Sequence, residues 1–97
     1  MEFNELDPLL HNQLRLAVMS ILLAKGEAEF NFIKEKSGAT AGNLSAQISK
    51  LKNAGYLEVN KSFKNNYPLT TCKITDQGIL AFERYVDALQ SYIKKDN

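Results

Sequence analysis

The stretch SGATAGNLSAQISKLKNAGYLEV, residues 37–59, contains the pattern that decides the fold. Leu44, Ile48 and Leu51 recur at helical spacing, which places them on one side of a helix. Thr40 is a suitable N-cap for this helix, and Gly55 is a suitable stop. We therefore expect a helix over about residues 41–54 with an apolar side on the core and a polar side facing outward.

The residues before this helix predict a second, shorter one. EAEFNFIKEKSG, residues 27–38, reads as an extended piece at 28–30 followed by a helix of about two turns that stops at Gly38. Phe30 and Ile33 are expected to face the core. Two helices joined by a short glycine-containing turn form a helix-turn-helix unit.

The residues after it predict a β-hairpin. YLEVNKSF, residues 56–63, and PLTTCKIT, residues 68–75, alternate with period two and contain β-branched residues, and the segment between them favours a turn. Pro68 is expected at the first residue of the second strand, where its missing N–H does least harm.

Long helices are expected at both ends of the chain. Asp7 and Pro8 are a capping residue and a tolerated first helical residue, so the first helix is predicted to start there and to end at Gly26. The last helix is predicted to begin after Thr75. The apolar surface of the last helix exceeds what a small core needs. It favours a homodimer interface that includes Tyr85, Leu89, Tyr92 and Ile93 over a helix that folds back on its own core.

Length and composition predict one domain spanning residues 1–97, of α+β class and mainly α. The chain has 97 residues, 44% of them hydrophobic and 24% charged, as in ordinary globular domains. Its apolar runs are too short to span a membrane, and the acidic N-terminus does not resemble a signal peptide. We expect a cytoplasmic protein.

Catalytic and metal sites find little support in the sequence. Cys72 is the only cysteine and His11 the only histidine, so no zinc-type ligand cluster can form. Cys72 is expected to be a small residue inside a strand, and His11 to have a solvated or capping role. We expect no enzymatic activity, no metal and no cofactor.

The positive charge of the chain is concentrated in its middle. Residues 31–75 carry seven lysines against two glutamates, a net charge of +5, although the whole chain carries only +1. A local positive field of this kind attracts polyanions.

The outward side of the third helix favours double-stranded DNA as that polyanion. Small residues allow close approach to the major groove, amide and hydroxyl groups can contact base edges, and a cation can contact phosphate. Asn43 could pair with adenine and Lys50 could contact phosphate. The predicted contacts are Thr40, Gly42, Asn43, Ser45, Ala46, Ser49 and Lys50 on the helix, and Lys61, Lys64, Asn65, Asn66 and Tyr67 on the hairpin.

The segments GNLSAQISKLKNAGYLEVNKSF, YPLTTCKIT and TDQGILAFERYVDAL, in this order, resemble the small stand-alone winged-helix transcriptional regulators related to the MarR and ArsR groups. The resemblance covers residues 6–93. It implies a winged helix-turn-helix with a two-stranded wing at about residues 61–68, a recognition helix at about 41–54 and a long C-terminal helix. It also implies a homodimer formed by the first and last helices, which adds Leu10, Leu14 and Phe82 to the predicted interface. A small-molecule effector is possible, although no residue identifies one.

Two residues depart from this family pattern. Relatives often carry arginine or another polar residue where this chain has Ala46, and a basic residue where it has Leu69. Both changes remove contacts to phosphate or base. They favour an alternative function, a winged-helix module that binds a partner protein and has little affinity for DNA.

Overall fold

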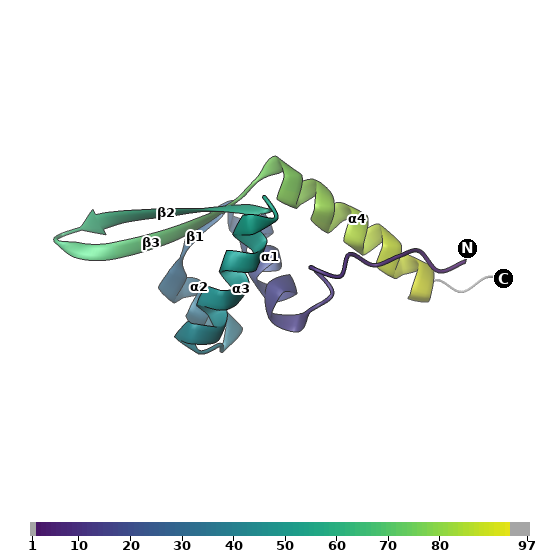
Figure 1. The fold of residues 1–97 in the computed structure, drawn as a ribbon, viewed down its shortest axis with the longest axis horizontal. Helices are drawn as coiled ribbons and strands as arrows, with labels where there is room; N and C mark the ends of the chain where they lie inside the picture. The colour runs from purple at the N-terminus through teal and green to yellow at the C-terminus, as the bar shows by residue number, and fades with distance from the viewer. Residues whose placement is uncertain (1, 94–97) are drawn as a thin grey trace.

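The computed structural model describes residues 2–93 and has the winged-helix architecture (Figure 1). Three helices form the body, a β-hairpin extends from it on one side, and the last helix extends on the other. This confirms the predicted α+β, mainly helical class. The elements are α1 (Gln13–Lys25), β1 (Glu27–Glu29), α2 (Phe30–Ser37), α3 (Ala41–Asn53), β2 (Leu57–Lys64), β3 (Tyr67–Ile74) and α4 (Asp76–Ile93).

The helix-turn-helix of α2 and α3 forms as predicted. Leu44 and Leu51 are fully buried and Ile48 nearly so, and they pack in one core with Ile33 of α2. The hydroxyl oxygen of Thr40 accepts a hydrogen bond from the Asn43 N–H at 3.2 Å, which caps α3. Between the two helices, Gly38 has a φ of 71°, a left-handed conformation that suits glycine.

The first helix begins later than the sequence predicts. Its N-cap is Asn12, whose side chain accepts from the Arg15 N–H at 2.9 Å, whereas Asp7 caps a separate turn through a 2.9 Å bond from the Leu9 N–H. The predicted start at Asp7 is therefore wrong. Asp7 and Asn12 are both residue types that commonly cap helices. Here the turn brings Leu10 into the core, and the Asp7 carboxylate accepts from the Tyr56 hydroxyl at 2.6 Å.

This contact changes the titration of Tyr56. Burial, followed by the hydrogen bond to Asp7, raises the pKa of Tyr56 from 10.0 to about 12. Tyr56 therefore remains a neutral hydrogen-bond donor at physiological pH. Its bond to Asp7 ties the N-terminal turn to the segment between α3 and β2.

The sheet is antiparallel with the order β1-β3-β2. The extended piece expected at 28–30 is β1, which lies one residue earlier and pairs with β3, while Phe30 begins α2. Asn65 and Asn66 form the two-residue hairpin turn with φ values of 53° and 66°, which asparagine tolerates better than most residues. Pro68 is the second residue of β3 rather than the first, opposite Phe63.

The junction between the hairpin and α4 explains why Thr75 is followed three residues later by Gly78. Thr75 donates its hydroxyl to the Gly55 carbonyl at 2.6 Å and accepts from the Gly78 N–H at 3.0 Å. A Cβ on Gly78 would lie 2.0 Å from the Tyr56 carbonyl oxygen. Only glycine allows α4 to start this close to the chain that leaves α3.

Cys72 lies fully buried in β3, as expected for a small residue inside a strand. Burial raises the pKa of its thiol to about 11, so the reactive thiolate is scarce at neutral pH. Residues 2–93 contain no group of three or more potential ligand side chains that could hold a metal ion. None of the helices in this part of the chain has the length and apolar character required to cross a membrane.

Candidate nucleic-acid interface

The outward side of α3 presents the predicted contact residues to solvent. Leu44, Ile48 and Leu51 turn inward, so the opposite side of the helix is free. Residues 41–53 contain two lysines and no carboxylate. The exposed set is Thr40, Gly42, Asn43, Ser45, Ala46, Ser49 and Lys50.

Nothing within the described chain requires glycine at position 42. A Cβ added to Gly42 would meet no heavy atom of residues 2–93 within 4 Å, and its φ is not in the left-handed region. Glycine in a helix costs up to about 1 kcal/mol relative to alanine. The open space above Gly42 allows another molecule to approach the backbone of α3 closely.

The Asn43 side chain is held by a chain of hydrogen bonds that reaches back to the N-terminal turn. Arg15 donates through Nε to the Leu9 carbonyl and through Nη1 to Gln47 Oε1, both at 2.5 Å. Gln47 then donates through Nε2 to Asn43 Oδ1 at 3.2 Å. Because arginine can only donate, it sets the orientation of the Gln47 amide, and Gln47 in turn orients Asn43.

Sequence patterns did not identify Arg15 and Gln47 as site residues. Gln47 lies four residues after Asn43, so helical spacing could have revealed this pair. Arg15 lies on α1, 32 positions before Gln47, and no local pattern connects the two residues.

The bond from Gln47 leaves part of the Asn43 amide available for a ligand. Oδ1 of Asn43 has a second acceptor site and Nδ2 has its two donors, and adenine recognition needs one acceptor and one donor.

The hairpin presents the remaining predicted residues. Lys61, Lys64, Asn65, Asn66 and Tyr67 are all exposed, and Lys64 pairs with Tyr67 beside the turn. Along β2, side chains alternate between two faces, and Lys61 shares a face with the buried Leu57. This face is the one toward α3.

A groove separates α3 from the hairpin. It has a volume of about 290 Å³, and its lining includes Ser45, Ser49 and Lys52 from α3 and Lys61 and Thr70 from the hairpin. The structure thus brings two predicted serines next to a predicted wing lysine. Lys52 is a further cation that the sequence interpretation omitted, although it lies three residues after Ser49 on the same side of α3.

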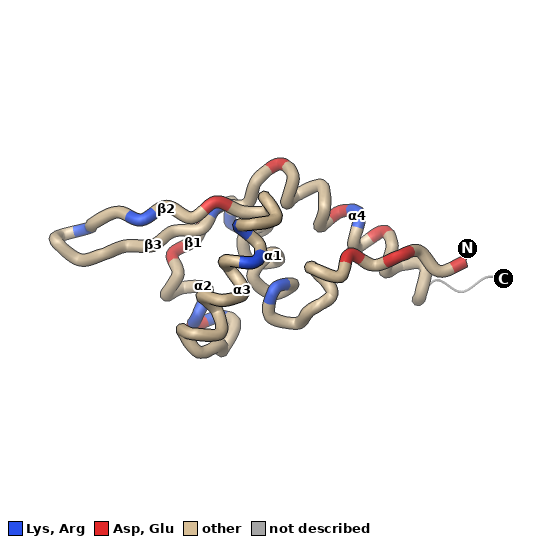
Figure 2. Tube along the Cα trace, viewed as in Figure 1, with Lys and Arg blue, Asp and Glu red and all other residues tan. Residues whose placement is uncertain are grey.

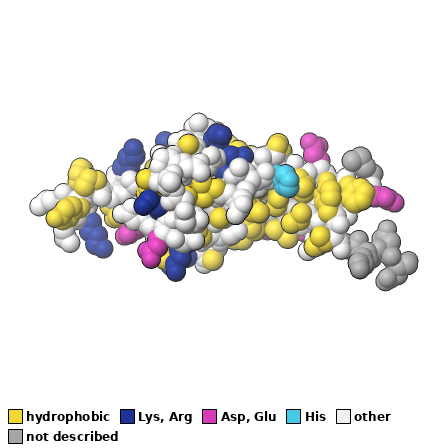
Figure 3. Space-filling model, turned by 90° about the horizontal axis from the view of Figure 1, so that it is seen from below, with side chains coloured by type: hydrophobic (Ala, Val, Ile, Leu, Met, Phe, Trp, Pro, Cys, Tyr) yellow, Lys and Arg dark blue, Asp and Glu magenta, His cyan; other side chains and the backbone are white. Residues whose placement is uncertain are grey.

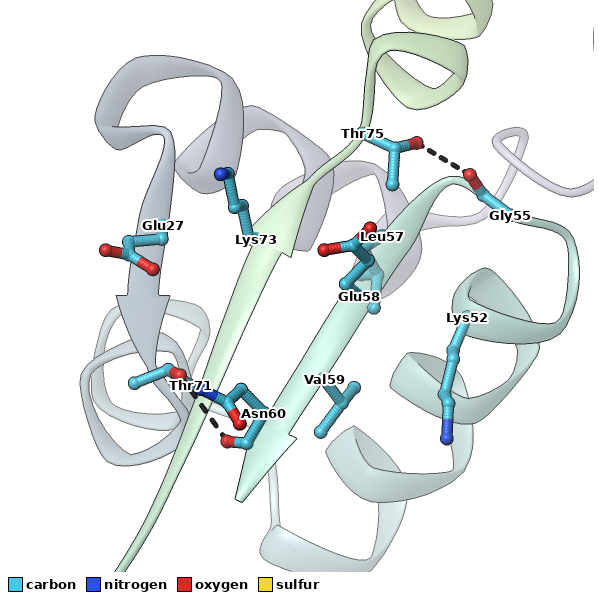
Figure 4. Close-up of a pocket in the computed structure, with 10 residues that line it drawn as sticks. All are labelled: Glu27, Lys52, Gly55, Leu57, Glu58, Val59, Asn60, Thr71, Lys73 and Thr75. Atoms are coloured by element: carbon cyan, nitrogen blue, oxygen red, sulfur yellow. Dashed lines mark hydrogen bonds between the residues drawn. The ribbon is translucent and has the colours of Figure 1, made fainter. Parts of the chain in front are cut away.

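The outer face of the sheet has a different character. Glu27, Lys73 and Glu58 lie directly across from one another on the three strands, around the hollow drawn in Figure 4. In this hollow the two carboxylates offset Lys73 and Lys52, so it carries no excess positive charge for a phosphate. The side of the hairpin that carries Lys61 is therefore better suited to a polyanion than this face.

The charges are also separated along the molecule. Figure 2 shows most lysine and arginine positions on the hairpin and the α1–α3 body, whereas acidic positions lie along the N-terminal segment and α4 and also on β1 and β2. Residues 41–53 carry two lysines without an acid, whereas residues 76–93 carry three acids and one arginine. The positive end of the molecule contains α3 and the hairpin.

The chain matches the family described as winged helix DNA-binding domain over residues 14–93. It is a member of this family. An uncharacterised protein of Methanocaldococcus jannaschii is 36% identical over 72 residues, which are 74% of this chain and 78% of that protein.

Two solved structures extend the comparison. A transcriptional regulator homologue from Pyrococcus horikoshii has a TM-score of 0.82 and 32% identity, over 88% of this chain and 84% of that one. A MarR-family regulator from Silicibacter pomeroyi has a TM-score of 0.68 at 15% identity, over 87% of this chain and 56% of that one, and it shares the fold. The predicted resemblance to small winged-helix transcriptional regulators is confirmed.

In this winged-helix chain, one side of α4 packs against the N-terminal segment of the chain. Phe3 stacks on Tyr92 with ring centroids 5.2 Å apart, and the Tyr92 hydroxyl donates to the Asn4 carbonyl at 2.7 Å. His11 Nδ1 lies 2.9 Å from the hydroxyl of Tyr85, which is buried. Tyr85 and Tyr92 therefore contact the chain itself.

A neighbouring side of α4 keeps an apolar stripe that the chain leaves partly or largely uncovered. Its members follow one another at alternating spacings of three and four residues, as in a coiled-coil seam. Figure 3 shows hydrophobic side chains over the end of the molecule that contains α4 and the N-terminal segment. The stripe consists of Ile79, Phe82, Val86, Leu89 and Ile93.

The predicted dimer residues thus fall into different environments. Phe82, Leu89 and Ile93 lie on this stripe, and Ile93 is 70% exposed. Leu14 is half-buried on α1. Leu10 is fully buried and Tyr85 nearly so, and both lie in the core of the chain, which removes them from any exposed interface.

Proposed function

We propose that this winged-helix protein binds specific double-stranded DNA sequences as a homodimeric transcriptional regulator. The observation that carries the proposal is the exposed, carboxylate-free side of α3, which has the hydrogen-bonded Asn43 at its edge toward α1 and a groove lined by Lys52 and Lys61 at its edge toward the hairpin. Base-reading and phosphate-binding groups thus occupy adjoining surfaces. Such a regulator acts where the DNA is, so the proposal includes a cytoplasmic location.

In this proposal α3 enters the major groove. Asn43 pairs with an adenine through its amide, while Ser45 and Ser49 face the base edges or phosphates nearer the wing. Lys50 and Lys52 contact phosphates on either side of the helix. The hairpin follows the backbone toward the minor groove with Lys61 and Lys64.

The homodimer rests on the stripe of α4. A second copy related by a two-fold axis would cover the same residues on both partners, as an isologous interface requires. Two α3 helices would then read half-sites one turn of DNA apart. Pairing two half-sites also raises the specificity above that of a single small module.

The test is selection of binding sites from a random duplex library, followed by titration of the selected duplex at several salt concentrations. The proposal expects a two-fold symmetric site and an affinity that falls steeply with salt, because bound phosphates release counterions. A duplex with the same composition in scrambled order is the control. No enrichment, with weak binding that is insensitive to salt, would contradict the proposal and favour the protein-interaction alternative.

A further inference from the structure

The outer half of the hairpin exposes two aromatic side chains. Phe63 is 76% exposed and Tyr67 is 75% exposed, and neither packs against the core cluster formed by the described residues. Figure 1 shows this part of β2 and β3 extending beyond the helical body, and Figure 3 shows hydrophobic side chains at the same end. A water-exposed phenyl ring on a projecting strand gains nothing for the fold.

The alternation of side chains along β2 shows on which face of the hairpin Phe63 lies. Leu57, Val59, Lys61 and Phe63 alternate with the other side chains of β2 and share one face. Leu57 is buried in the core, and Lys61 lines the groove beside α3. Phe63 therefore continues the α3-facing side, roughly 7 Å beyond Lys61 at the usual rise per strand residue.

Pro68 completes an apolar pair on this side. It lies directly opposite Phe63 in the register, and its rigid ring stands next to the phenyl group. β1 pairs with β3 only at residues 71–73, so within the described chain no strand flanks β3 at Pro68 on the side away from β2. Tyr67 lies one position along and belongs to the other face of the hairpin.

Charge identifies the partner of this apolar pair. Residues 59–72 contain Lys61 and Lys64 and no acidic residue, so the positive charges stand on both sides of Phe63 along β2. The turn is only two residues wide, Asn65 and Asn66, and both offer amide groups. A narrow, cationic tip with an apolar side chain matches the minor groove, where phosphates surround the stacked base pairs.

We propose that Phe63, supported by Pro68, is an apolar wedge that enters the minor groove beside the site read by α3 and partly unstacks one base step. This inference rests on the proposed function. Phenylalanine and proline are among the side chains that minor-groove proteins insert between base pairs, which bends the duplex toward the major groove. The wedge would favour flexible pyrimidine–purine steps at a position that no polar group reads.

The experiment uses the full chain and the selected duplex, with dyes at both DNA ends to report bending. A second duplex carries 2-aminopurine at the candidate step, since this base fluoresces more strongly when it is unstacked. Phe63→Ala is expected to abolish most of the bend and the fluorescence rise, and to weaken binding roughly 5- to 150-fold, as removal of an aromatic side chain that stacks on a base does. Its salt slope should remain unchanged.

Two variants serve as controls. Phe63→Leu keeps an apolar wedge and should retain most of the bend. Tyr67→Ala removes an equally exposed ring from the other face; it should lower the affinity, because Tyr67 is a predicted contact, but keep the bend of the parent. A bend and a fluorescence rise that persist in Phe63→Ala would overturn the wedge while leaving the regulator proposal intact. A bend that disappears in Tyr67→Ala instead would also overturn it. A parent protein that does not bind the selected duplex would overturn both proposals.

Discussion

Asn43 shows how a single side chain on this surface is prepared for recognition. Its carbonyl oxygen accepts from Gln47, and Gln47 is held by Arg15. An exposed asparagine loses rotamer freedom when it binds, so a side chain that is already oriented loses less. In the proposed function, the hydrogen-bond chain would act on specificity through Asn43 and not through charge at the surface.

Asn43→Ala should reduce discrimination at one base pair of the half-site by roughly 5- to 150-fold, which corresponds to about 1–3 kcal/mol for a bidentate contact. Gln47→Ala should reduce discrimination at the same base pair by a smaller factor, because Asn43 remains but is less well oriented. Competition with duplexes that vary at each position measures both effects.

The double variant tests whether the two residues act together. If Gln47 works through Asn43, adding Gln47→Ala to Asn43→Ala should change discrimination little further. Additive losses at two different base pairs would show that Gln47 contacts DNA itself, which would contradict the positioning role. Melting temperatures of all variants establish that the fold is intact.

At the scale of elements, α3 and the hairpin form one surface because of the strand register. Lys61 faces Ser45 and Ser49 across the groove only because β2 alternates with Leu57 in the core. A shift of one residue would turn Lys61 to the outer side, where Glu58 and Lys73 lie. The hairpin register thus decides which lysines join the candidate interface.

Replacing Lys61 and Lys64 together with alanine should weaken binding to all DNA sequences similarly. The slope of log affinity against log salt should flatten by about 0.9 for each phosphate that the variant no longer neutralises. Lys73→Ala is the matched control, since this lysine lies on the same hairpin but at its base, between Glu27 and Glu58 on the face opposite to Lys61. Equal salt slopes for the parent and the double variant would show that the wing is not part of the DNA interface.

At the scale of the whole molecule, the described chain is elongated, with principal extents of 59 × 25 × 21 Å. The candidate DNA surface lies toward one end and the apolar stripe of α4 toward the other (Figures 1 and 2). The N-terminal segment and α4 at the second end carry more acidic than basic residues. A dimer joined through α4 would therefore leave both α3 helices and both wings free.

Val86→Glu should convert the dimer to a monomer, because it places two carboxylates in the middle of the proposed seam. Val86 is 37% exposed in the single chain, so this substitution should leave the monomer folded. Leu80→Glu is the matched control: Leu80 lies on the same helix, is 47% exposed and stands outside the stripe. Sedimentation equilibrium measures the oligomeric state.

A dimer that survives Val86→Glu but dissociates in Leu80→Glu would place the interface on another side of α4. If both variants and the parent are monomers, the homodimer proposal fails. A monomeric Val86→Glu variant should still bind a single half-site, with lower affinity and a shallower salt slope, because only one set of phosphate contacts remains.

Local signals in the sequence determined the elements themselves. The spacing of Leu44, Ile48 and Leu51, the cap at Thr40 and the glycine at position 38 predict α2 and α3 because these signals act over a few residues. Alternation predicts the hairpin for the same reason. Since the buried side of α3 follows from this spacing, the exposed side and its candidate DNA contacts follow as well.

Tertiary contacts decided what local signals leave open. Asp7 and Asn12 can both cap a helix, and the bond from Tyr56 to Asp7 across 49 positions accompanies the choice of Asn12. The link from Arg15 to Gln47 and the burial of Tyr85 against the N-terminal segment likewise join residues far apart in the sequence. Only packing of the whole chain brings such residues together, so no periodicity or cap could reveal them.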